Sequence, residues 1–516
     1  MLTSLTAPAF AKTWCIEDGN ITVKAGDTGN DVTQKGETTY GDTDTIITNQ
    51  NKDIASSNTV TIETKDKNDK VEVTLKDVNI EATGGKAAVS VTGSGNTTIE
   101  LDGDNHLTGG ISDNGSYGLS GISSSGSLTI SGGETDSLTA QGGSGTDGSG
   151  GRGIFSKDLT ISGGTVTANG GDGGSGSGSH GGNGIYSSSG VAISGGAVTA
   201  NGGDSKDGSG GNGIYSSGGV TISSGSTVTA NGGNGEDGSG GRGITSNGGV
   251  TVSGGTVNAK GGSGKNGNGG DGIRSFNPVA ISGGTVNANG GNSDYSNGGD
   301  GIRSLDHVAI SGGTVKSNGG SGNLSGGNGI ISYDIDLSGS LELTAKAGSP
   351  NGKALSRVGS ELDLNTIKDK LDPGAKVTAT DADGKVIQQV SIPRPVEPEE
   401  PSSSSDGGSA TPSAPASFLP GLTVTDKDGQ RISYTSTQSG NTLTVCVGRF
   451  TASLRASLAA LRQLRAEGIE TITFQTILCS TTLSVDELLA MGGEDAEVVL
   501  THHIRSSTLT VGGKAV

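Results

Sequence analysis

The feature that most constrains the fold of this chain is a Gly-Ile dipeptide that returns every 28 to 32 residues through the middle of the sequence. A fixed period in this range is typical of repeat architectures, in which each repeat is one small structural unit. A disordered linker has no reason to keep such a register. The spacing therefore predicts a stack of equivalent units, whose isoleucines are Ile122, Ile154, Ile185, Ile214, Ile244, Ile273, Ile302 and Ile330.

Within each unit the apolar residues alternate with polar ones, which is the pattern of short β-strands. In the segment GVAISGG, Val191 and Ile193 fall on one side of a strand and Ala192 falls on the other. The segments GIYS and TVTANGG follow the same rule, so each unit contains three strands separated by glycines. One unit is too small to bury its own apolar side, but stacked units bury it together. The sequence thus predicts an all-β fold, a parallel β-helix or β-solenoid.

Stacking places equivalent residues above one another, so each inward position becomes a ladder of similar side chains. The isoleucines named above form the first ladder. The second contains Ile130, Ile161, Ile193, Ile222, Val252, Ile281, Ile310 and Leu337. The third contains Leu138, Val166, Val198, Val228, Val257, Val286, Val315 and Leu343. The 98 glycines are typical of low-complexity sequence by composition alone. In a solenoid, however, we expect them at corners that need a positive φ or a close approach of two backbones.

Changes in composition divide the chain into segments. Residues 1–11 contain Ala9-Phe10-Ala11, which fits a signal-peptidase site, so we interpret them as a signal peptide remnant; an ordinary unstructured N-terminus is the alternative. No run of 18 apolar residues is present, and we expect no membrane insertion. The remaining segments are an N-terminal cap region (12–57), the parallel β-helix (58–350), a solenoid cap (351–392), a Pro/Ser-rich linker (393–418) and a small α+β domain (419–516).

The predicted C-terminal domain has the composition of an ordinary globular protein. The segment 450–468 reads as a helix with Leu454, Leu458 and Leu461 on one face, and a capping box at 484–487 opens a second, short helix. The segments TLTVCVG, ETITFQT, AEVVLTH and STLTVGG read as strands. Cys446 and Cys479 form a disulfide or remain free thiols; the sequence leaves both open. We expect this domain to bind a cell wall or a protein partner, or to serve only as a structural cap.

The segments VTLKDVNIEA, AAVSV and NTTIELDGDNHLTGG, followed by repeats of the type ISGGTVTANGG, resemble the secreted carbohydrate-binding parallel β-helix proteins of clostridia and related gut bacteria. The resemblance covers residues 58–350. It implies a right-handed helix, an extracellular location, an acidic plant polysaccharide as ligand, and calcium at Asp-Gly-Ile corners. Only Asp271 and Asp300 stand in such corners here, so the resemblance does not imply calcium at every coil. The equivalent residues elsewhere are Arg152, Asn183, Asn212, Arg242 and Asn328.

The position that follows each ladder isoleucine faces outward, and its residues form a strip that is our candidate carbohydrate-binding site. Phe155, Tyr186 and Tyr215 come first along the strip, and Arg274 and Arg303 follow. Aromatic rings stack on sugars, and guanidinium groups hold carboxylates with two hydrogen bonds. The alternative is that tyrosine and arginine simply suit exposed strand positions.

Four aspartates are candidate calcium ligands, because calcium prefers carboxylate oxygens. Asp147 and Asp237 follow a Gly-Gly-x-Gly-x pattern that half-resembles a calcium-binding nonapeptide. Asp271 and Asp300 are the corner residues named above. The alternatives are solvated turns for the first pair and exposed ion pairs with Arg274 and Arg303 for the second. A separate corner column, Asn169, Asn201, Asn231, Asn289 and Asn318, indicates asparagines that bond along the helix.

The net charge of −19 disfavours binding to nucleic acid and to anionic lipid surfaces, since both carry phosphates. Three functions stay open. The favoured hypothesis is a secreted or cell-surface protein that binds an acidic plant or host polysaccharide without catalysis, with calcium as a possible cofactor. The first alternative is a surface adhesin or structural stalk, in which the repeats supply only length. The second is a polysaccharide lyase that uses calcium, acidic ligands and an Arg or Lys base.

Overall fold

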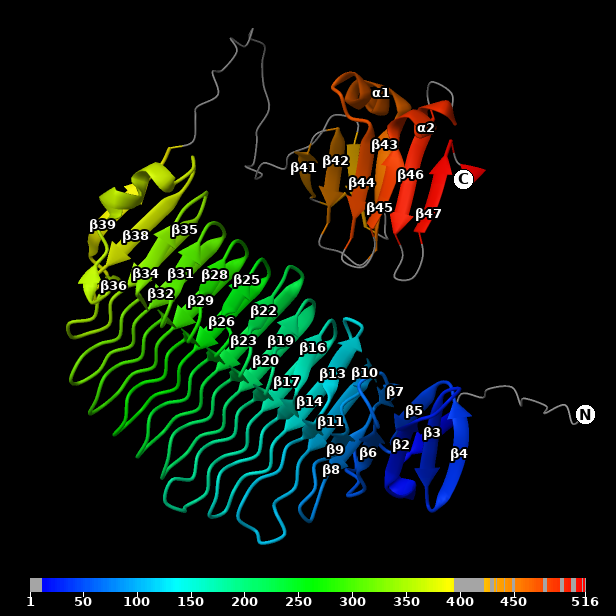
Figure 1. Ribbon diagram of the computed structural model, residues 1–516, viewed down its shortest axis with the longest axis vertical. Coiled ribbons are helices and arrows are strands. Elements are labelled where there is room, and N and C mark those ends of the chain that lie inside the picture. The colour runs from blue at the N-terminus through cyan, green and yellow to red at the C-terminus, as the bar shows by residue number, and fades with distance from the viewer. Residues whose placement is uncertain are drawn as a thin grey trace, which may run out of the picture. The chain divides into compact units, whose positions relative to one another are not determined.

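The computed structural model divides the chain into two compact units, Met1–Val396 and Glu397–Val516 (Figure 1). In the first unit the described residues are 12–393. In the second they are 422–426, 431–432, 434–439, 441–447, 451–476, 480–491, 496–502, 507–512 and 514–515. The predicted signal remnant (1–11) and, apart from Pro393, the predicted linker (393–418) therefore lie outside the described residues.

The first unit is a parallel β-solenoid, as the repeat predicted. A typical coil consists of β18 (Ile185–Ser187), β19 (Val191–Ile193) and β20 (Gly196–Asn201). Each of these strands pairs in parallel with its equivalent in the next coil, β21 (Ile214–Ser216), β22 (Val220–Ile222) and β23 (Ser226–Asn231). Figure 1 shows the coils side by side from blue to yellow. The pairing matches Ile185 with Ile214, so the register is that of the sequence repeat.

Three sheets result from this pairing. Sheet A has 12 strands from β1 (Lys12–Cys15) to β34 (Asp334–Leu337), and sheet C has 12 strands between β8 (Asn79–Glu81) and β39 (Val386–Ser391). Sheet B has 15 strands. In chain order these are β2 (Ile21–Ala25), β3 (Asn30–Gln34), β4 (Glu37–Asp42), β6 (Val60–Glu63), β9 (Val89–Thr92), β12 (Ile122–Ser124), β15 (Ile154–Ser156), β18, β21, β24 (Ile244–Ser246), β27 (Ile273–Ser275), β30 (Ile302–Ser304), β33 (Ile330–Ser332), β36 (Leu355–Arg357) and β37 (Ser360–Glu361).

The core lies between the three sheets and consists of the predicted ladders. Every residue of the three apolar ladders is buried. In the eight sheet B strands from β12 to β33 the third residue is a buried serine, and Ser246, for example, donates to the carbonyl oxygens of Gly218 and Gly249 at 2.8 and 2.7 Å. Each fully buried aliphatic side chain contributes roughly 1.5–3 kcal/mol to folding. Repetition of the same few inward aliphatic residues from coil to coil therefore replaces the core of a globular domain.

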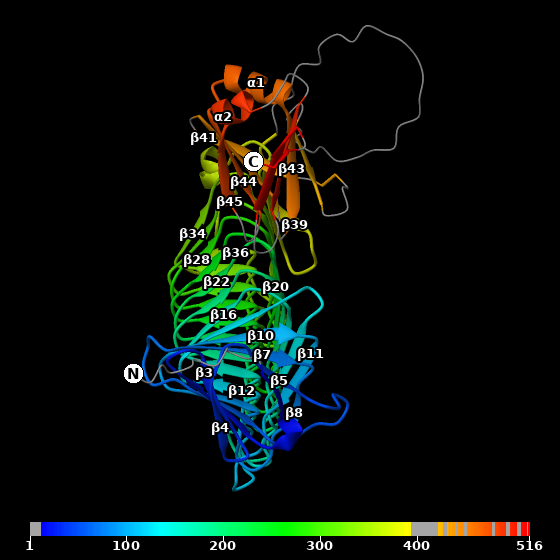
Figure 2. The same cartoon turned by 90° about the vertical axis from the view of Figure 1, so that its right-hand side faces the viewer.

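Parallel pairing extends beyond the predicted limits of 58 and 350. It begins with β1, which pairs with β5 (Thr45–Thr48), and it ends with β38 (Lys376–Thr380), which pairs with β35 (Glu342–Lys346). These outer coils keep the inward–outward alternation but lack the Gly-Ile dipeptide, and the repeat therefore did not show them. Antiparallel strands close the stack, with the hairpin β3–β4 at its N-terminal end (Figure 2) and β37 and β39 at the other. The 3-10 helix Leu364–Lys370 lies beside the last coil.

Glycine has two separate roles in the coils. At the corner between sheets A and C the second glycine of the Ser-Gly-Gly motif has a positive φ, as at Gly284 (80°) and Gly313 (78°). Along the long loops from sheet C to sheet B, by contrast, glycines permit backbones to touch. The amide of Gly241 donates to the carbonyl of Gly233 in its own coil at 2.8 Å, and the amide of Gly262 in the next coil donates to Gly241 at 2.8 Å. A zigzag of backbone hydrogen bonds thus ties both limbs of each loop into the stack.

Polar ladders also run along the helix. The side-chain amide of Asn201 donates a hydrogen bond to the side-chain oxygen of Asn169, and that of Asn231 donates to Asn201 in the same way, both at 2.9 Å. Asn318 donates to Asn289 at 2.7 Å. The predicted asparagine column is confirmed, and Lys260 interrupts it at the coil between Asn231 and Asn289.

The second unit has two small sheets and two helices. One sheet contains β40 (Leu422–Thr425), β43 (Ala452–Ser457), β46 (Glu497–His502), β47 (Ser507–Val511) and β48 (Lys514–Ala515). The other contains β41 (Thr435–Ser439), β42 (Thr442–Cys446), β44 (Thr471–Gln475) and β45 (Ser480–Ser484). The helices are α1 (Leu458–Ala466) and α2 (Val485–Ala490). Cys446 is a free thiol, and Cys479 lies outside the described residues.

The predicted helix over 450–468 is wrong in its first half. Residues 452–457 form β43, in which Ala452, Leu454 and Ala456 alternate as buried residues with more exposed polar ones. The helix begins only after Ser457, whose hydroxyl accepts a hydrogen bond from the amide of Ala460. Leucines four residues apart fit both a helix and a strand. The pairing with β46 favours the strand for residues 452–457.

Replacing Gly241 with Ala should destabilise the solenoid, because the added Cβ overlaps the carbonyl oxygen of Gly211 in the preceding coil. Overpacking of this kind costs about 1–3 kcal/mol. Gly190→Ala is the matched control, since its Cβ would find its nearest neighbour at 3.7 Å and its φ is not positive. We expect a lower midpoint of thermal unfolding for Gly241→Ala alone. Equal midpoints for the two variants would contradict the packed zigzag.

Candidate functional site

The predicted strip forms one continuous column on the outer face of sheet B. The second residue of each three-residue strand points outward, and strand pairing joins these residues coil by coil. In order they are Phe155, Tyr186, Tyr215, Thr245, Arg274, Arg303 and Ile331. Thr245 is buried and separates an aromatic half from a basic half.

In the aromatic half the rings cover one another. The rings of Tyr186 and Tyr215 are stacked with centroids 5.0 Å apart, and those of Phe155 and Tyr186 are 5.6 Å apart and tilted. The guanidinium of Arg152, from the coil before Tyr186, lies 4.3 Å from the Tyr186 centroid. Both faces of the Tyr186 ring are therefore occupied, and this residue offers a ligand its edge and hydroxyl group. We did not predict this covering of the Tyr186 ring from the sequence, because the repeat does not show that Arg152 lies over the strip.

The basic half surrounds two buried aspartates at the adjacent corner. Arg242 Nε lies 3.3 Å and Arg274 Nη1 lies 3.7 Å from Asp271 Oδ2, and Arg303 Nη1 lies 3.4 Å from Asp300 Oδ2. The other oxygen of each carboxylate accepts a backbone hydrogen bond from the next coil, at 2.9 Å for Asp271 and 2.6 Å for Asp300. The aspartates thus belong to the corner ladder that asparagines form elsewhere, and three guanidinium groups surround their two charges.

Stacking of the coils brings the carboxyl groups of Asp271 and Asp300 close together, so their negative charges repel each other. Burial, followed by the charge of Asp271 one coil away, raises the pKa of Asp300 to about 6. The hydrogen bonds from Asn328 and the charge of Arg303 act in the opposite direction. Burial lowers the pKa of the Arg274 guanidinium, which nevertheless stays charged at neutral pH. This cluster of three guanidinium groups and two carboxyl groups therefore carries a net positive charge on a chain whose total charge is −19.

The four predicted calcium ligands do not form one site. Asp147 and Asp237 are exposed on loops separated by two intervening coils, and Asp237 accepts a hydrogen bond from Asn266 at 2.9 Å. Asp271 and Asp300 lie together, but guanidinium groups and backbone amides occupy their oxygens. Within the described ranges, no three His, Cys, Asp or Glu side chains gather as a metal site.

A second column on the same face was missed by the sequence reasoning. It occupies the position three residues after the ladder residue and consists, in the last four coils, of Phe276, Leu305, Tyr333 and Val358. Phe276 is 45% exposed and Tyr333 is 66% exposed. Leu305, Tyr333 and Val358 line a cavity of about 170 Å³ together with Arg303. The sequence contains a signal for this column. The same position holds Ser188, Ser217 and Asn247 in earlier coils and becomes apolar only in the last ones.

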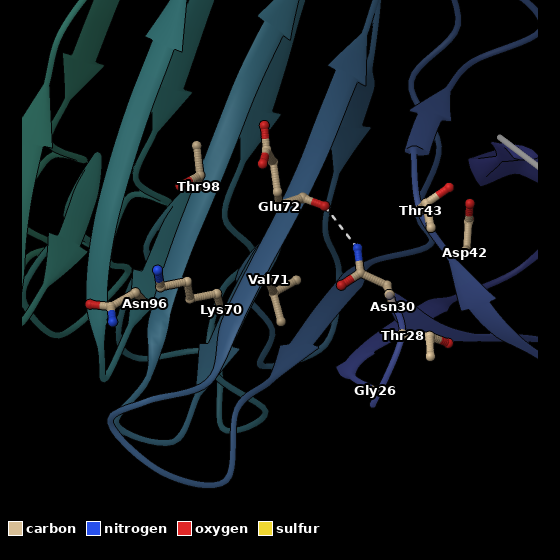
Figure 3. A pocket seen from close by; sticks show the side chains of 11 residues that line it. Gly26, Thr28, Asn30, Asp42, Thr43, Lys70, Val71, Glu72, Asn96 and Thr98 are labelled. Carbon is tan, nitrogen blue, oxygen red and sulfur yellow. Dashed lines mark hydrogen bonds between the residues drawn. The ribbon is translucent and has the colours of Figure 1, made fainter. Parts of the chain in front are cut away.

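A larger polar cavity of about 550 Å³ lies at the N-terminal end of the solenoid (Figure 3). Its walls are the β3–β4 hairpin and the outer face of sheet A, where β7 (Lys70–Lys76) contributes Lys70 and Glu72 and β10 (Asn96–Asp102) contributes Asn96 and Thr98. Asn30 fixes the hairpin to the coil through a 2.8 Å hydrogen bond to the carbonyl of Glu72. Its charged lining residues are one cation, Lys70, and two carboxylates, Glu72 and Asp42, so the cavity offers no cationic site for an acidic ligand.

Comparisons with protein-family models, with curated proteins and with solved structures found no match. In the part of the chain that the structure describes, no helix has the length and apolar character needed to cross a membrane.

The raised pKa of Asp300 makes stability depend on pH. The folded protein binds the proton more tightly than the unfolded chain, so this group stabilises the fold below its ordinary pKa, and the stabilisation is lost as pH rises through about 6. Asp300→Asn keeps the oxygen acceptor and removes the charge. We expect a gain of about 1–3 kcal/mol for this variant at pH 7.5 and a smaller difference at pH 4.5, measured by denaturant unfolding. A variant less stable than wild type at pH 7.5 would show that the Arg303 pair outweighs burial.

Proposed function

We propose that this protein is a secreted or cell-surface carbohydrate-binding protein that holds an acidic plant or host polysaccharide along the outer face of sheet B. The observation that carries the proposal is the gathering of Arg242, Arg274 and Arg303 beside exposed aromatic residues on a strongly acidic chain. A guanidinium holds a carboxylate or sulfate through two parallel hydrogen bonds. The resemblance to clostridial β-helix proteins supports the same ligand class.

The repeat supports a linear ligand. Successive coils rise by about 4.8 Å, which is close to the advance of one sugar in an extended polysaccharide. A chain lying along the helix axis thus meets one outward side chain per coil. The cationic groups concentrate in the coils of β24, β27 and β30, so acid groups of the polymer bind there, while Tyr186 and Tyr215 offer hydroxyl groups further along.

The protein's own charge of −19 repels a polyanion at long range. Local guanidinium groups offset this repulsion at contact distance, and calcium bridging between the polymer and Asp147 or Asp237 is a further proposal. Binding measured with calcium and then with a chelator tests the metal separately. The proposed role is binding without a chemical step. If no acidic polymer binds, we would conclude that the solenoid is a structural stalk whose repeats supply only length.

Arg303→Gln should weaken binding to an acidic polysaccharide about tenfold, since it removes one charged hydrogen-bond donor pair. Lys316→Gln is the matched control, because Lys316 is an exposed cation of the same coil on sheet C. Isothermal titration at low and high salt gives the affinities, and circular dichroism checks each fold. The difference between the variants should shrink as salt screens the charges. Equal loss in both variants would mean that total charge, and not this face, governs binding.

A further inference from the structure

The C-terminal end of the sheet B face differs from the rest in its accessible groups. We call the residues Phe276, Arg303, Leu305, Tyr333 and Val358 the terminal patch. The apolar members occupy one column on four successive coils, and Arg303 lies in the neighbouring column. Unlike Tyr186, which is stacked on both faces, Tyr333 is 66% exposed, and no ring contact to it is found among the described residues. The terminal patch therefore offers aromatic surface that the predicted strip does not.

Aromatic and aliphatic side chains alternate along the terminal patch, so its two aromatic rings are separated by two coils. Phe276 and Tyr333 lie two coils apart, about 9–10 Å along the axis. Arg303 belongs to the coil between them and lines the same cavity as Tyr333. Two coils match the length of one disaccharide in an extended polysaccharide. If one sugar lies over Phe276 and another over Tyr333, the single sugar between these two lies beside the guanidinium of Arg303.

Arg303 is the cation of the terminal patch, and it is more accessible to a ligand than the neighbouring Arg274. The side chain of Arg303 is 38% exposed, whereas that of Arg274 is 20% exposed and lies between Asp271 and the ring of Phe276. On the other side of Arg303 the strip position is the apolar Ile331. A polymer with an acid group on every sugar would press a carboxylate against Ile331, where desolvation without a partner costs free energy.

From this arrangement we infer that the preferred ligand is an alternating polysaccharide, in which an acidic sugar is followed by an uncharged one that packs on an aromatic ring. This inference rests on the proposed function and narrows its ligand class. The uncharged sugar would lie over Phe276 or Tyr333, and the acidic sugar would meet Arg303. A homopolymer of uronic acid satisfies the guanidinium but leaves alternate acid groups over apolar side chains.

The test compares two probes of matched length on the full chain, hyaluronan as the alternating polymer and polygalacturonate as the uronate homopolymer. We expect hyaluronan to bind at least several-fold more tightly. Tyr333→Ala should lower its affinity about tenfold and should change polygalacturonate binding less. Tyr295→Ala is the control, since Tyr295 is equally exposed but lies on a glycine loop.

The outcomes separate the two proposals. If polygalacturonate binds as tightly as hyaluronan and Tyr333→Ala changes neither, while Arg303→Gln weakens both, the alternating ligand is wrong and the acidic-polysaccharide function stands. If neither polymer binds, both proposals fail. If Tyr333→Ala instead converts a dimer into a monomer in sedimentation without changing glycan affinity, the terminal patch is a contact between copies and the inference is overturned.

Discussion

The backbone hydrogen bonds between successive coils fix the spacing on which every other property of the solenoid depends. They run through three sheets and also through the glycine loops, where Gly211, Gly233 and Gly241 alternate between contacts within a coil and contacts to the next. Because each coil must pass at about 4.8 Å from its neighbours, each strand residue sits directly above an equivalent residue. A side chain is therefore favourable in this fold only if it packs well against another copy of itself or a near relative.

This rule explains which columns build the core and the ladders and which leave side chains accessible to solvent. Isoleucine on isoleucine gives the core, asparagine on asparagine gives a hydrogen-bonded ladder, and tyrosine on tyrosine gives stacked rings whose faces are no longer free. Aspartate on aspartate is the unfavourable case, and the coils of Asp271 and Asp300 accommodate it with surrounding arginines and a raised pKa at Asp300. We accordingly propose that ligand-binding groups lie where a column changes its character, as the strip does between Thr245 and Arg274 and the second column does between Asn247 and Phe276.

The repeat alone was sufficient to predict the parallel solenoid, its three ladders and the register that unites Phe155, Tyr186, Tyr215, Arg274 and Arg303 in one column. It did not reveal the first coils near Lys12, where the alternation persists without the glycine motif. Neither the stacking that covers Tyr186 nor the position of Arg152 over its ring follows from strand alternation, because both depend on side-chain directions across coils. In the second unit, β43 was mistaken for a helix because leucine spacing alone does not show the pairing with β46.

We propose that a polysaccharide lies on the outer face of sheet B and covers its C-terminal end. Hydroxyl-radical footprinting with and without hyaluronan tests it most directly, because aromatic side chains react readily when they are exposed to solvent. Phe276 and Tyr333 should lose reactivity when the polymer binds, whereas Tyr40 and Tyr295, which are exposed on other parts of the first unit, should keep theirs. Protection of Tyr295 with unchanged reactivity at Tyr333 would place the ligand on the glycine loops and contradict the account.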